Sequence, residues 1–484
     1  MKRQISIRKV SLILVAFLLM FLSGLVPPQL GLSAEGWQIA CIFVGTLLLW
    51  LFVDTTWSSV LCMIALCFSP LYTYSSVLAG SWGNWIVSFL IFSSMVTYTL
   101  TQSGFLRRVA VWFITRPIAK KNPWVFLGLL FLAPLVIGAF MSPIPTFIVF
   151  VPIIEQIFQE LGYKKGDHFP NVVTMGVLAA ASVSTATTPI AHTFPILAMS
   201  LYAQDTGSTI DFMSYTAAGV VAGLVMYAII LLVLRFVAKP ELTRLKNLDI
   251  DALKKDSGPL TKKETYSLIV FGVVVLLWMA PGPLQFIAPA AAKFINSFGT
   301  PMPAMIGVVA LSLIKVDGEP LLRFKDAASK GVPWSAILLV AATMILSNAL
   351  VNEKAGVVAA LISAIGPAVQ SMSPALFVFI VIMLTAVLTN FISNTVAVTM
   401  FYSVALPIVY ASPAMGINPA ALASMIGAAS CIAMATPPAT AHAALASGTG
   451  WLGTKSMLSY GMIISVLCGA VLALVGYPIA AALM

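Results

Sequence analysis

The chain has 484 residues, of which 60% are hydrophobic and 9% are charged, and its formal net charge is +10. An average soluble domain has about 25% charged residues, so this composition excludes a water-soluble globular core. The basic residues lie in short loops between apolar runs, where membrane topology explains them, and we therefore expect no nucleic-acid partner. The composition predicts a polytopic, all-α membrane protein in contact with the lipid bilayer.

Apolar runs along the chain predict eleven transmembrane helices. The first follows Lys2-Arg3 and extends to about residue 32; without a small-residue cleavage pattern, it is interpreted as a helix and not as a secretory signal. The other ten are expected near residues 37–53, 56–74, 84–104, 172–200, 212–236, 264–281, 300–314, 334–362, 419–447 and 456–482. Two further apolar stretches, about 124–160 and 374–410, are too long for one crossing. They predict re-entrant hairpins, with two long tilted helices as the alternative.

The distribution of charge favours the hairpins. With both hairpins in place, all Lys and Arg residues except Lys293 and Lys354 fall on one side of the membrane. The positive-inside rule then predicts a cytoplasmic amino terminus and an external carboxyl terminus, in a bacterial inner or plasma membrane. The cysteines lie inside apolar segments without paired spacing, which indicates neither disulfides nor a metal site.

The two hairpins belong to two similar halves of the chain. In each half a spanning helix precedes a hairpin with a polar tip, and a helix interrupted by Thr-Pro follows it. Thr188 comes 46 residues after Ser142, and Thr436 comes 43 residues after Ser393. Because the hairpins open to opposite sides, the halves form an inverted repeat, which is typical of secondary transporters with a site at the membrane midplane.

This repeat predicts the organisation of the chain. The expected parts are N-terminal scaffold helices (1–80), a first repeat (81–238) with a hairpin at about 124–160 and a broken helix at 172–200, a cytoplasmic linker (239–263), further scaffold helices (264–333), and a second repeat (334–484) with a hairpin at about 374–410 and a broken helix at 419–447.

Four interruptions place a helix-capping residue before a proline or an amide. They are Ser142-Pro143, Thr188-Pro189, Thr436-Pro437 and Ser393-Asn394-Thr395. Ser and Thr are good N-caps and proline is tolerated at the first helical position, so four half-helices are expected to begin near the bilayer centre. Their positive ends attract an anion without Lys or Arg. One such interruption is more often structural, but four in matched positions favour a binding site.

Charged side chains are scarce where this site is expected. From residue 335 to the end, the only ones are Glu353, Lys354 and Lys455, so a carboxylate proton relay is disfavoured. His192 and His442 follow the two Thr-Pro breaks closely. Either imidazole can bind the anion when protonated, or couple a proton; the alternative is a structural hydrogen bond between helices.

These features resemble the divalent-anion/sodium symporters (DASS), which carry dicarboxylates, citrate or sulfate. The resemblance covers about residues 33–484, and its strongest motifs are Ser393-Asn394-Thr395, residues 435–438 (ATPP) and residues 260–264 (LTKKE). It implies a homodimer through the scaffold helices, a Na⁺ site and a substrate site. The implied cation ligands are Thr389, Ser393, Asn394 and the backbone at Ala435. The implied substrate residues are Asn394, Thr395, Thr436 and Pro437, with Ser142, Thr146, Thr188 and Pro189 as their candidates in the first half.

The first half departs from the family pattern. Pro143 and Ile144 stand where the family has Asn and Thr, Gly138 stands where a serine ligand is usual, and Thr187 stands where a glycine is usual. These differences leave a first cation site open. Sodium-independent exchangers of the family carry an arginine after the first motif's serine and a histidine in the second motif, whereas residues 142–146 and 393–397 contain neither.

The sequence therefore predicts a secondary active transporter of small organic di- or tricarboxylates, of the succinate, malate, 2-oxoglutarate or citrate type. Coupling to Na⁺, no other cofactor, and alternating access with an elevator-like moving domain are expected. The alternatives are a carrier of sulfate or another inorganic oxyanion, a sodium-independent exchanger and, less in keeping with matched hairpins, a channel. An intramembrane enzyme is disfavoured, because no paired aspartate or His-Glu-x-x-His motif lies in an apolar segment.

Overall fold

The computed structural model describes residues 7–29, 32–190, 192–248, 250, 259–360, 363 and 372–484. Within these residues the chain is helical apart from one short antiparallel hairpin of β1 (Lys315–Val316) and β2 (Glu319–Pro320). Six described helices are long and apolar enough to cross a membrane, or up to eight if each bent pair is one span. A total of eleven crossings therefore stays a prediction.

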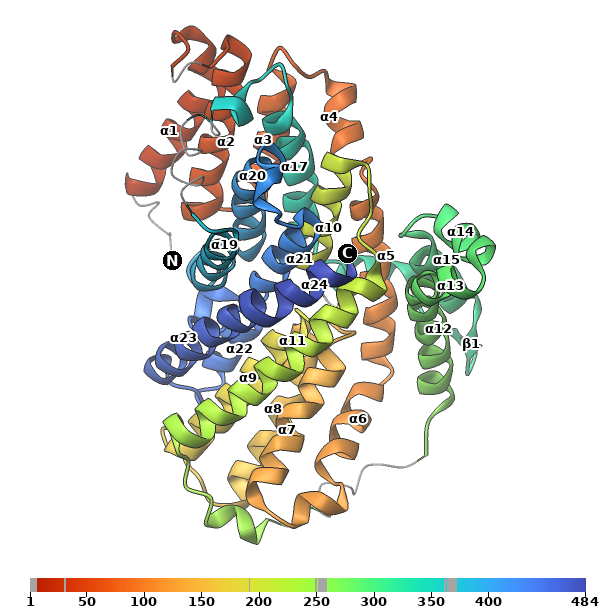
Figure 1. Cartoon of the computed structure of the whole chain (residues 1–484). Coiled ribbons are helices and arrows are strands. Elements are labelled where there is room, and N and C mark those ends of the chain that lie inside the picture. Colours follow the sequence, from red (N-terminus) through yellow and green to blue (C-terminus); the bar gives the residue numbers. More distant parts are fainter. Residues whose placement is uncertain are drawn as a thin grey trace.

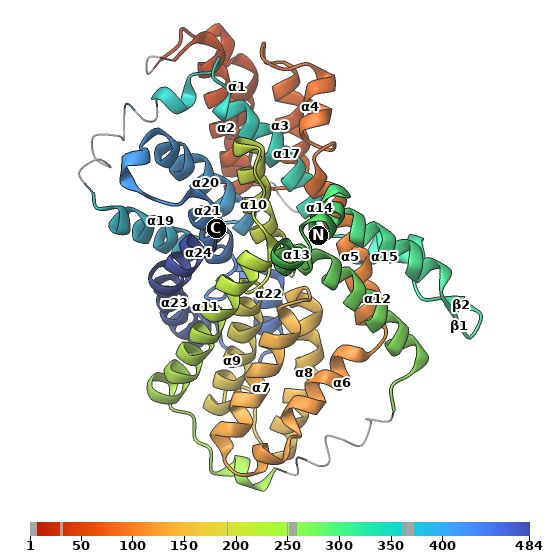
Figure 2. The ribbon, with the colours of Figure 1, turned by 45° about the vertical axis from the view of Figure 1, so that its right-hand side comes forward.

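Two groups of helices lie at the periphery (Figures 1 and 2). The first, at the top of Figure 1, contains α1 (Ile7–Leu22), η1 (Ser23–Leu25), α2 (Ala34–Phe52), α3 (Trp57–Cys67) and α4 (Tyr74–Gly80). The second, at its right, contains α12 (Lys262–Met279), α13 (Pro281–Ile287), α14 (Pro289–Ser297) and α15 (Met302–Leu313). The expected spans at 264–281 and 300–314 correspond to α12 and α15, and each meets a shorter helix at a bend: α12 and α13 meet at 54°, and α14 and α15 at 71°.

The first helix of each repeat lies between these groups and the rest of the molecule. α5 (Trp85–Gln102) contacts α12 and α15, whereas α17 (Trp334–Val351) contacts α2, α3 and α4. The two helices also contact each other, and two thirds of α17 is buried. The expected span at 334–362 is shorter in the structure, because the polar residues after Val351 form a turn that closes at Gly356 with a φ of 64°.

Each long apolar stretch folds as two helices joined by a short tip. The first pair is α7 (Pro123–Gly138) and α8 (Pro143–Glu160), and the second is α19 (Pro374–Leu388) and α20 (Asn394–Ala411). The outer ends have side-chain caps: Asn122 accepts from the Trp124 N–H at 2.8 Å, and Ser373 accepts from the Leu376 N–H at 3.3 Å. The helices of each pair contact each other, as a hairpin requires.

The two interrupted helices are broken in the structure. The first consists of α9 (His168–Ser184) and α10 (Thr193–Thr206), and the second of α21 (Pro419–Ala429), η8 (Pro437–Ala439) and α22 (Ala441–Gly448). They cross between the halves, because α10 packs on α20 and α21 and α22 packs on α8 and α9. Each is followed by a long helix with a π-helical turn, namely α11 (Phe212–Leu232) with η3 (Val233–Ala238), and α23 (Thr454–Val471) with η9 (Leu472–Gly476) and α24 (Tyr477–Leu483).

Shorter elements connect these parts. They are α6 (Phe105–Ile114), η2 (Pro117–Lys120), η4 (Arg244–Asn247), α16 (Phe324–Asp326), η6 (Ala327–Gly331) and η7 (Pro413–Met415). The expected cytoplasmic linker at 239–263 is described except for residues 249 and 251–258, which lie outside the described part of the chain.

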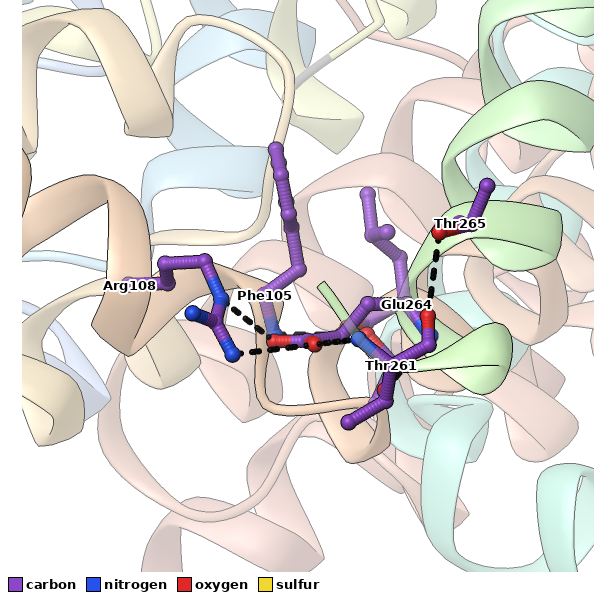
Figure 3. Close-up of polar contacts among 7 residues, drawn as sticks. Phe105, Arg108, Thr261, Glu264 and Thr265 are labelled. Atoms are coloured by element: carbon purple, nitrogen blue, oxygen red, sulfur yellow. Dashed lines mark hydrogen bonds and ion pairs between the residues drawn. The ribbon is translucent and has the colours of Figure 1, made fainter. Parts of the chain in front are cut away.

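A buried ion pair holds α6 against the start of α12 (Figure 3). Arg108 Nε lies 2.9 Å from Glu264 Oε1, and Arg108 Nη2 lies 3.1 Å from Oε2. Glu264 also completes a capping box, because its Oε2 accepts from the Thr261 N–H at 2.7 Å. A bidentate guanidinium and a capping amide thus satisfy a carboxylate that is only 3% exposed.

Candidate functional site

The tips of both hairpins and the breaks of both interrupted helices surround one cavity of about 1030 Å³. Residues 142–145 and 393–395 contribute the tips, and residues 192–194 and 438–442 contribute the breaks. The opposite wall comes from α5 and from residues 330–339 around the start of α17. Segments separated by up to 300 residues of sequence therefore converge on one place, as the matched order of the two halves predicts.

The cavity wall is mostly apolar, with hydroxyl and amide groups at the tips and breaks, and it is nearly uncharged. It contains no Asp, Glu or Arg among the described residues, and its one lysine, Lys330, lies 2.9 Å from Asp326 Oδ1. α8 and α20 both begin at the wall, so the positive ends of two helix dipoles are directed at the cavity. Such an arrangement favours an anionic occupant.

Six of the thirteen predicted site residues lie in the cavity wall. Ser142, Ser393, Asn394, Thr395, His192 and His442 line it. The others lie behind the wall, in or near the tips and the unwound segments: Thr146, Thr188, Pro189, Thr389, Ala435, Thr436 and Pro437.

Two of the four expected helix starts are wrong. α8 and α20 begin after Ser142 and Ser393 as predicted, but α10 begins at Thr193, several residues beyond Pro189. Thr436 precedes only the short η8, and Thr440 caps α22 by accepting from the Ala443 N–H at 3.1 Å. The hydroxyls of Ser142, Ser393 and Thr436 make no capping hydrogen bond either. The sequence predicts these caps from local propensity. In the structure, hydrogen bonds to the hairpin tips instead fix the unwound segments that contain Thr188 and Thr436.

The two Thr-Pro threonines make matched hydrogen bonds to the hairpin tips. Thr188 Oγ1 donates to the carbonyl of Ala139, and Thr436 Oγ1 donates to the carbonyl of Asn390 at 2.5 Å. Each acceptor lies three residues before the serine of its tip. In both halves the threonine therefore ties the unwound segment to its own hairpin. Thr146 is also engaged locally, because its Oγ1 donates to the Ser142 carbonyl at 2.9 Å.

A glycine of the following long helix approaches each unwound segment closely. A Cβ at Gly219 would lie 2.4 Å from the carbonyl oxygen of Thr187, and one at Gly461 would lie 2.7 Å from Ala435 Cα. Real side chains do not reach such distances, so only glycine fits at either place. Thr187 and Ala435 each precede a matched threonine. The close approach of a glycine is therefore a second correspondence between the halves, in addition to the hydrogen bonds of the two threonines.

The second hairpin tip and its unwound segment form a cluster of buried amides and carbonyls. Thr389 Oγ1 and Asn394 Nδ2 both donate to the Ser430 carbonyl at 3.0 Å. Ser393 follows the same turn and faces the cavity. Carbonyl and hydroxyl oxygens of this type are the ligands with which unwound helices coordinate Na⁺ in transporters.

Sequence reasoning missed Asn390, the centre of this cluster. Its Oδ1 accepts from the N–H groups of Met434 at 2.9 Å and Ala435 at 2.8 Å. Its Nδ2 donates to the carbonyls of Ala386 at 2.8 Å and Ile432 at 3.3 Å. An amide beside Thr389 in an apolar run was a signal that could have identified it.

The first half lacks the corresponding cluster. A Cβ at Gly138 would lie 2.1 Å from Ser184 Oγ, so the Ser184 side chain already occupies the space beside this glycine. Ser184 Oγ itself donates to the Ala181 carbonyl at 2.7 Å. The Ser184 hydroxyl therefore bonds within α9 while it fills the space beside Gly138 of the hairpin.

The two histidines differ in their contacts. His442 is 3% exposed, and its Nε2 shares hydrogen bonds with Ser182 Oγ at 2.9 Å and Thr440 Oγ1 at 3.4 Å. The bond to Ser182 joins α22 to α9, so it is the structural hydrogen bond between helices that was the alternative to an anion-binding histidine. His192 packs against the Phe194 ring at 4.1 Å between centroids, and its buried Nδ1 has no hydrogen-bond partner among the described residues.

Comparison with known proteins identifies the family. The family described as "Sodium:sulfate symporter transmembrane region" matches residues 5–484, which is nearly the whole chain. The chain belongs to this family. It is therefore a membrane transporter and not an enzyme, as the motifs at residues 393–395 and 435–438 predicted.

Relatives and a solved structure agree with this assignment. The sodium-dependent dicarboxylate transporter SdcS of Staphylococcus saprophyticus is 24% identical over 417 residues, which cover 82% of this chain and 77% of that protein. An uncharacterized transporter of Haemophilus influenzae is 21% identical and covers 74% of each chain. The crystal structure of the YdaH transporter of Alcanivorax borkumensis is similar at a TM-score of 0.58 and 13% identity, covering 84% of this chain and 87% of that one, which shows the fold alone.

Proposed function

We propose that the protein transports small organic dicarboxylates in symport with Na⁺, by alternating access. The observation that carries this proposal is the single cavity bounded by four matched chain segments, with two helix amino termini and no carboxylate in its described wall. A fixed anion site of this polarity suits a cargo with carboxylate groups. The similarity to a sodium-dependent dicarboxylate transporter supports the class of cargo.

The cargo site is assigned to the residues of the wall. Asn394 and Thr395 lie in the first turn of α20, and Ser142 faces them from the other tip across the cavity. Helix amides with neutral hydroxyl and amide side chains recognise a carboxylate without an ion pair. The remaining substrate candidates act indirectly: Thr146 orders the first tip, and the segments with Thr188-Pro189 and Thr436-Pro437 hold the breaks against the tips.

The coupling Na⁺ is assigned to the second hairpin. Thr389, Ser393 and Asn394 supply side-chain oxygens there, and the unwound segment from Ser430 to Ala435 supplies carbonyls. Because Asn394 belongs to both groups, cation and cargo share a residue. Binding of one therefore orders the site for the other, which is the basis of coupling.

The moving part is assigned to the hairpins, the broken helices, α11 and α23, which travel as one elevator-like body against α1–α5, α12–α15 and α17. The cavity lies at the boundary between the two bodies, since α5 and residues 330–339 form one wall and the tips form the other. Gln102 and Lys330, which line it, lie next to segments that the positive-inside rule places in the cytoplasm. This proposal includes an amino terminus in the cytoplasm, a carboxyl terminus outside and, from the family resemblance, a homodimer formed by the scaffold helices.

Uptake into proteoliposomes tests the function. Labelled succinate, citrate and sulfate are compared with and without an inward Na⁺ gradient, and succinate is expected to enter in a Na⁺-dependent manner. Asn394→Ala is expected to abolish uptake, while Asn296→Ala, an exposed amide on α14, serves as the matched control. Normal Na⁺-driven uptake by Asn394→Ala would show that the site is wrongly assigned. Preferential uptake of sulfate would show that the cargo is an inorganic oxyanion and not a dicarboxylate.

A further inference from the structure

The first half has no side chain that can hold a second cation at the matched position. Thr389, Asn390 and Asn394 correspond by their distance from the tip serine to Gly138, Ala139 and Pro143, none of which has a side-chain oxygen.

The hydroxyls nearby bond within their own segment, whereas Thr389 bonds from the tip to the break. Ser184, Thr185 and Thr187 donate to the carbonyls of Ala181, Ser182 and Ser184 at 2.7, 2.7 and 2.6 Å. Among the described residues, only the second hairpin tip therefore offers side-chain oxygens at the matched positions.

One Na⁺ leaves the charge of a dianionic cargo incompletely balanced. A dicarboxylate with a single Na⁺ has a net charge of −1, and an unbalanced charge is unfavourable in a site within the membrane. The described wall has no arginine, and its lysine already pairs with Asp326. A second positive charge that arrives with the cargo would complete the balance.

His192 is placed to provide that charge. It is the N-cap residue of α10, it lines the cavity, and it belongs to the half whose hairpin tip has no side-chain oxygen at the matched positions. Its buried Nδ1 has no partner among the described residues, whereas the Nε2 of His442 is held by Ser182 and Thr440. Imidazole is also the side chain whose protonation changes most readily near neutral pH.

The other titratable groups around the cavity do not compete for this role. They are Tyr98 on α5, Lys330 on η6 and His442 on α22, and α17 and α20 contribute none to the wall. Cys431 on α21 donates to the Thr185 carbonyl behind the break. Asp205 belongs to the opposite end of α10, where it accepts from Tyr402 Oη at 2.8 Å.

We propose that His192 takes up one proton when a dianion binds and carries it across the membrane, so that one Na⁺ and one H⁺ accompany each dianion. The proton comes from the solution on the side of loading, binds an imidazole nitrogen, and is released to the other side with the cargo; no covalent bond to the cargo forms. This inference rests on the proposed function.

The geometry makes the proton and the cargo depend on each other. A cation at a helix amino terminus is unfavourable when the site is empty, because it faces the positive end of the dipole. A bound carboxylate reverses the sign of the local field, so the imidazolium is favoured only with cargo present. The complete load of dianion, Na⁺ and H⁺ is neutral, and transport is therefore expected to be insensitive to membrane potential.

Proton movement in proteoliposomes tests the inference. Labelled succinate uptake is measured at a fixed Na⁺ gradient, with a pH-sensitive dye trapped inside and the potential clamped by K⁺ and valinomycin. For the wild type we expect about one proton per succinate, no response to potential, and a rate that falls by up to about tenfold per pH unit above the titration range of the imidazole. His192→Gln is expected to keep Na⁺ dependence but to lose the proton signal and to move net negative charge. His168→Gln is the matched control, because His168 contacts the Ala238 carbonyl and lies outside the cavity wall.

The outcomes separate this inference from the proposed function. Absence of any Na⁺-driven uptake of an organic acid rejects the proposed function. Na⁺-driven uptake without proton movement, or with an unchanged proton-to-succinate ratio in His192→Gln, rejects the role of His192. If His192→Gln does not fold, the proton-to-succinate ratio of the wild type and the dependence of its uptake on membrane potential test the inference. The same two measurements on His192→Asn then test the role of the imidazole.

Discussion

Asn390→Ala is expected to disconnect the second hairpin tip from its unwound segment. The substitution removes the acceptor for the buried N–H groups of Met434 and Ala435 and the donor to the Ala386 and Ile432 carbonyls. Each buried N–H left without a partner costs about 1–2 kcal/mol, so the two together predict a destabilisation of about 2–4 kcal/mol. Asn394→Ala is expected to cost about 1 kcal/mol or less, because the Ser430 carbonyl still accepts from Thr389.

Thermal unfolding of the purified protein in detergent, followed by tryptophan fluorescence, measures this difference. Asn390→Ala is expected to melt clearly below the wild type, and Asn394→Ala close to it, although neither transports. Added Na⁺ is expected to raise the melting temperature of the wild type but not of either variant, since a bound ion stabilises only a folded site. Equal melting temperatures for Asn390→Ala and the wild type would show that Asn390 does not hold the unwound segment.

Three further predictions concern other contacts. Gly219→Ala and Gly461→Ala should each sharply reduce uptake, because the added Cβ meets backbone atoms at 2.4 and 2.7 Å. The control Gly272→Ala, on α12 in open space, should transport normally. Normal uptake by both site variants would refute the close approach. Thr436→Val should slow uptake without loss of expression, since it removes the hydroxyl bond to the Asn390 carbonyl. Thr206→Val, which removes an exposed hydroxyl bond to the Tyr202 carbonyl, should behave as the wild type in the same assay. Arg108→Ala should destabilise the protein by about 2–3 kcal/mol by leaving the buried Glu264 carboxylate without its cation, whereas Arg323→Ala, which breaks an exposed pair, should leave the unfolding temperature unchanged.

The sequence predicted the positions of the hairpins and the breaks better than the structure of the breaks. Apolar length and the spacing of polar tips depend on the bilayer and the repeat, so the starts of α8 and α20 after Ser142 and Ser393 could be predicted. The starts of α10 and α22 could not, because Thr188 and Thr436 bond to hairpin carbonyls instead of capping helices. Asn390 was missed for a related reason: the N–H groups from which its Oδ1 accepts lie more than 40 residues away, beyond the reach of local sequence patterns.

The contacts between the two halves restrict what the transporter can do. Ser182 in the first half bonds to His442 in the second, and Asp205 in the first bonds to Tyr402 in the second. Neither half can change position while the other stays, since buried polar pairs would have to separate in a medium that offers no replacement. Leakage of an ion through one half, without movement of the other half, is thereby suppressed. Tight coupling between ion and cargo can thus arise from hydrogen bonds between the two halves, without a separate gate for each solute.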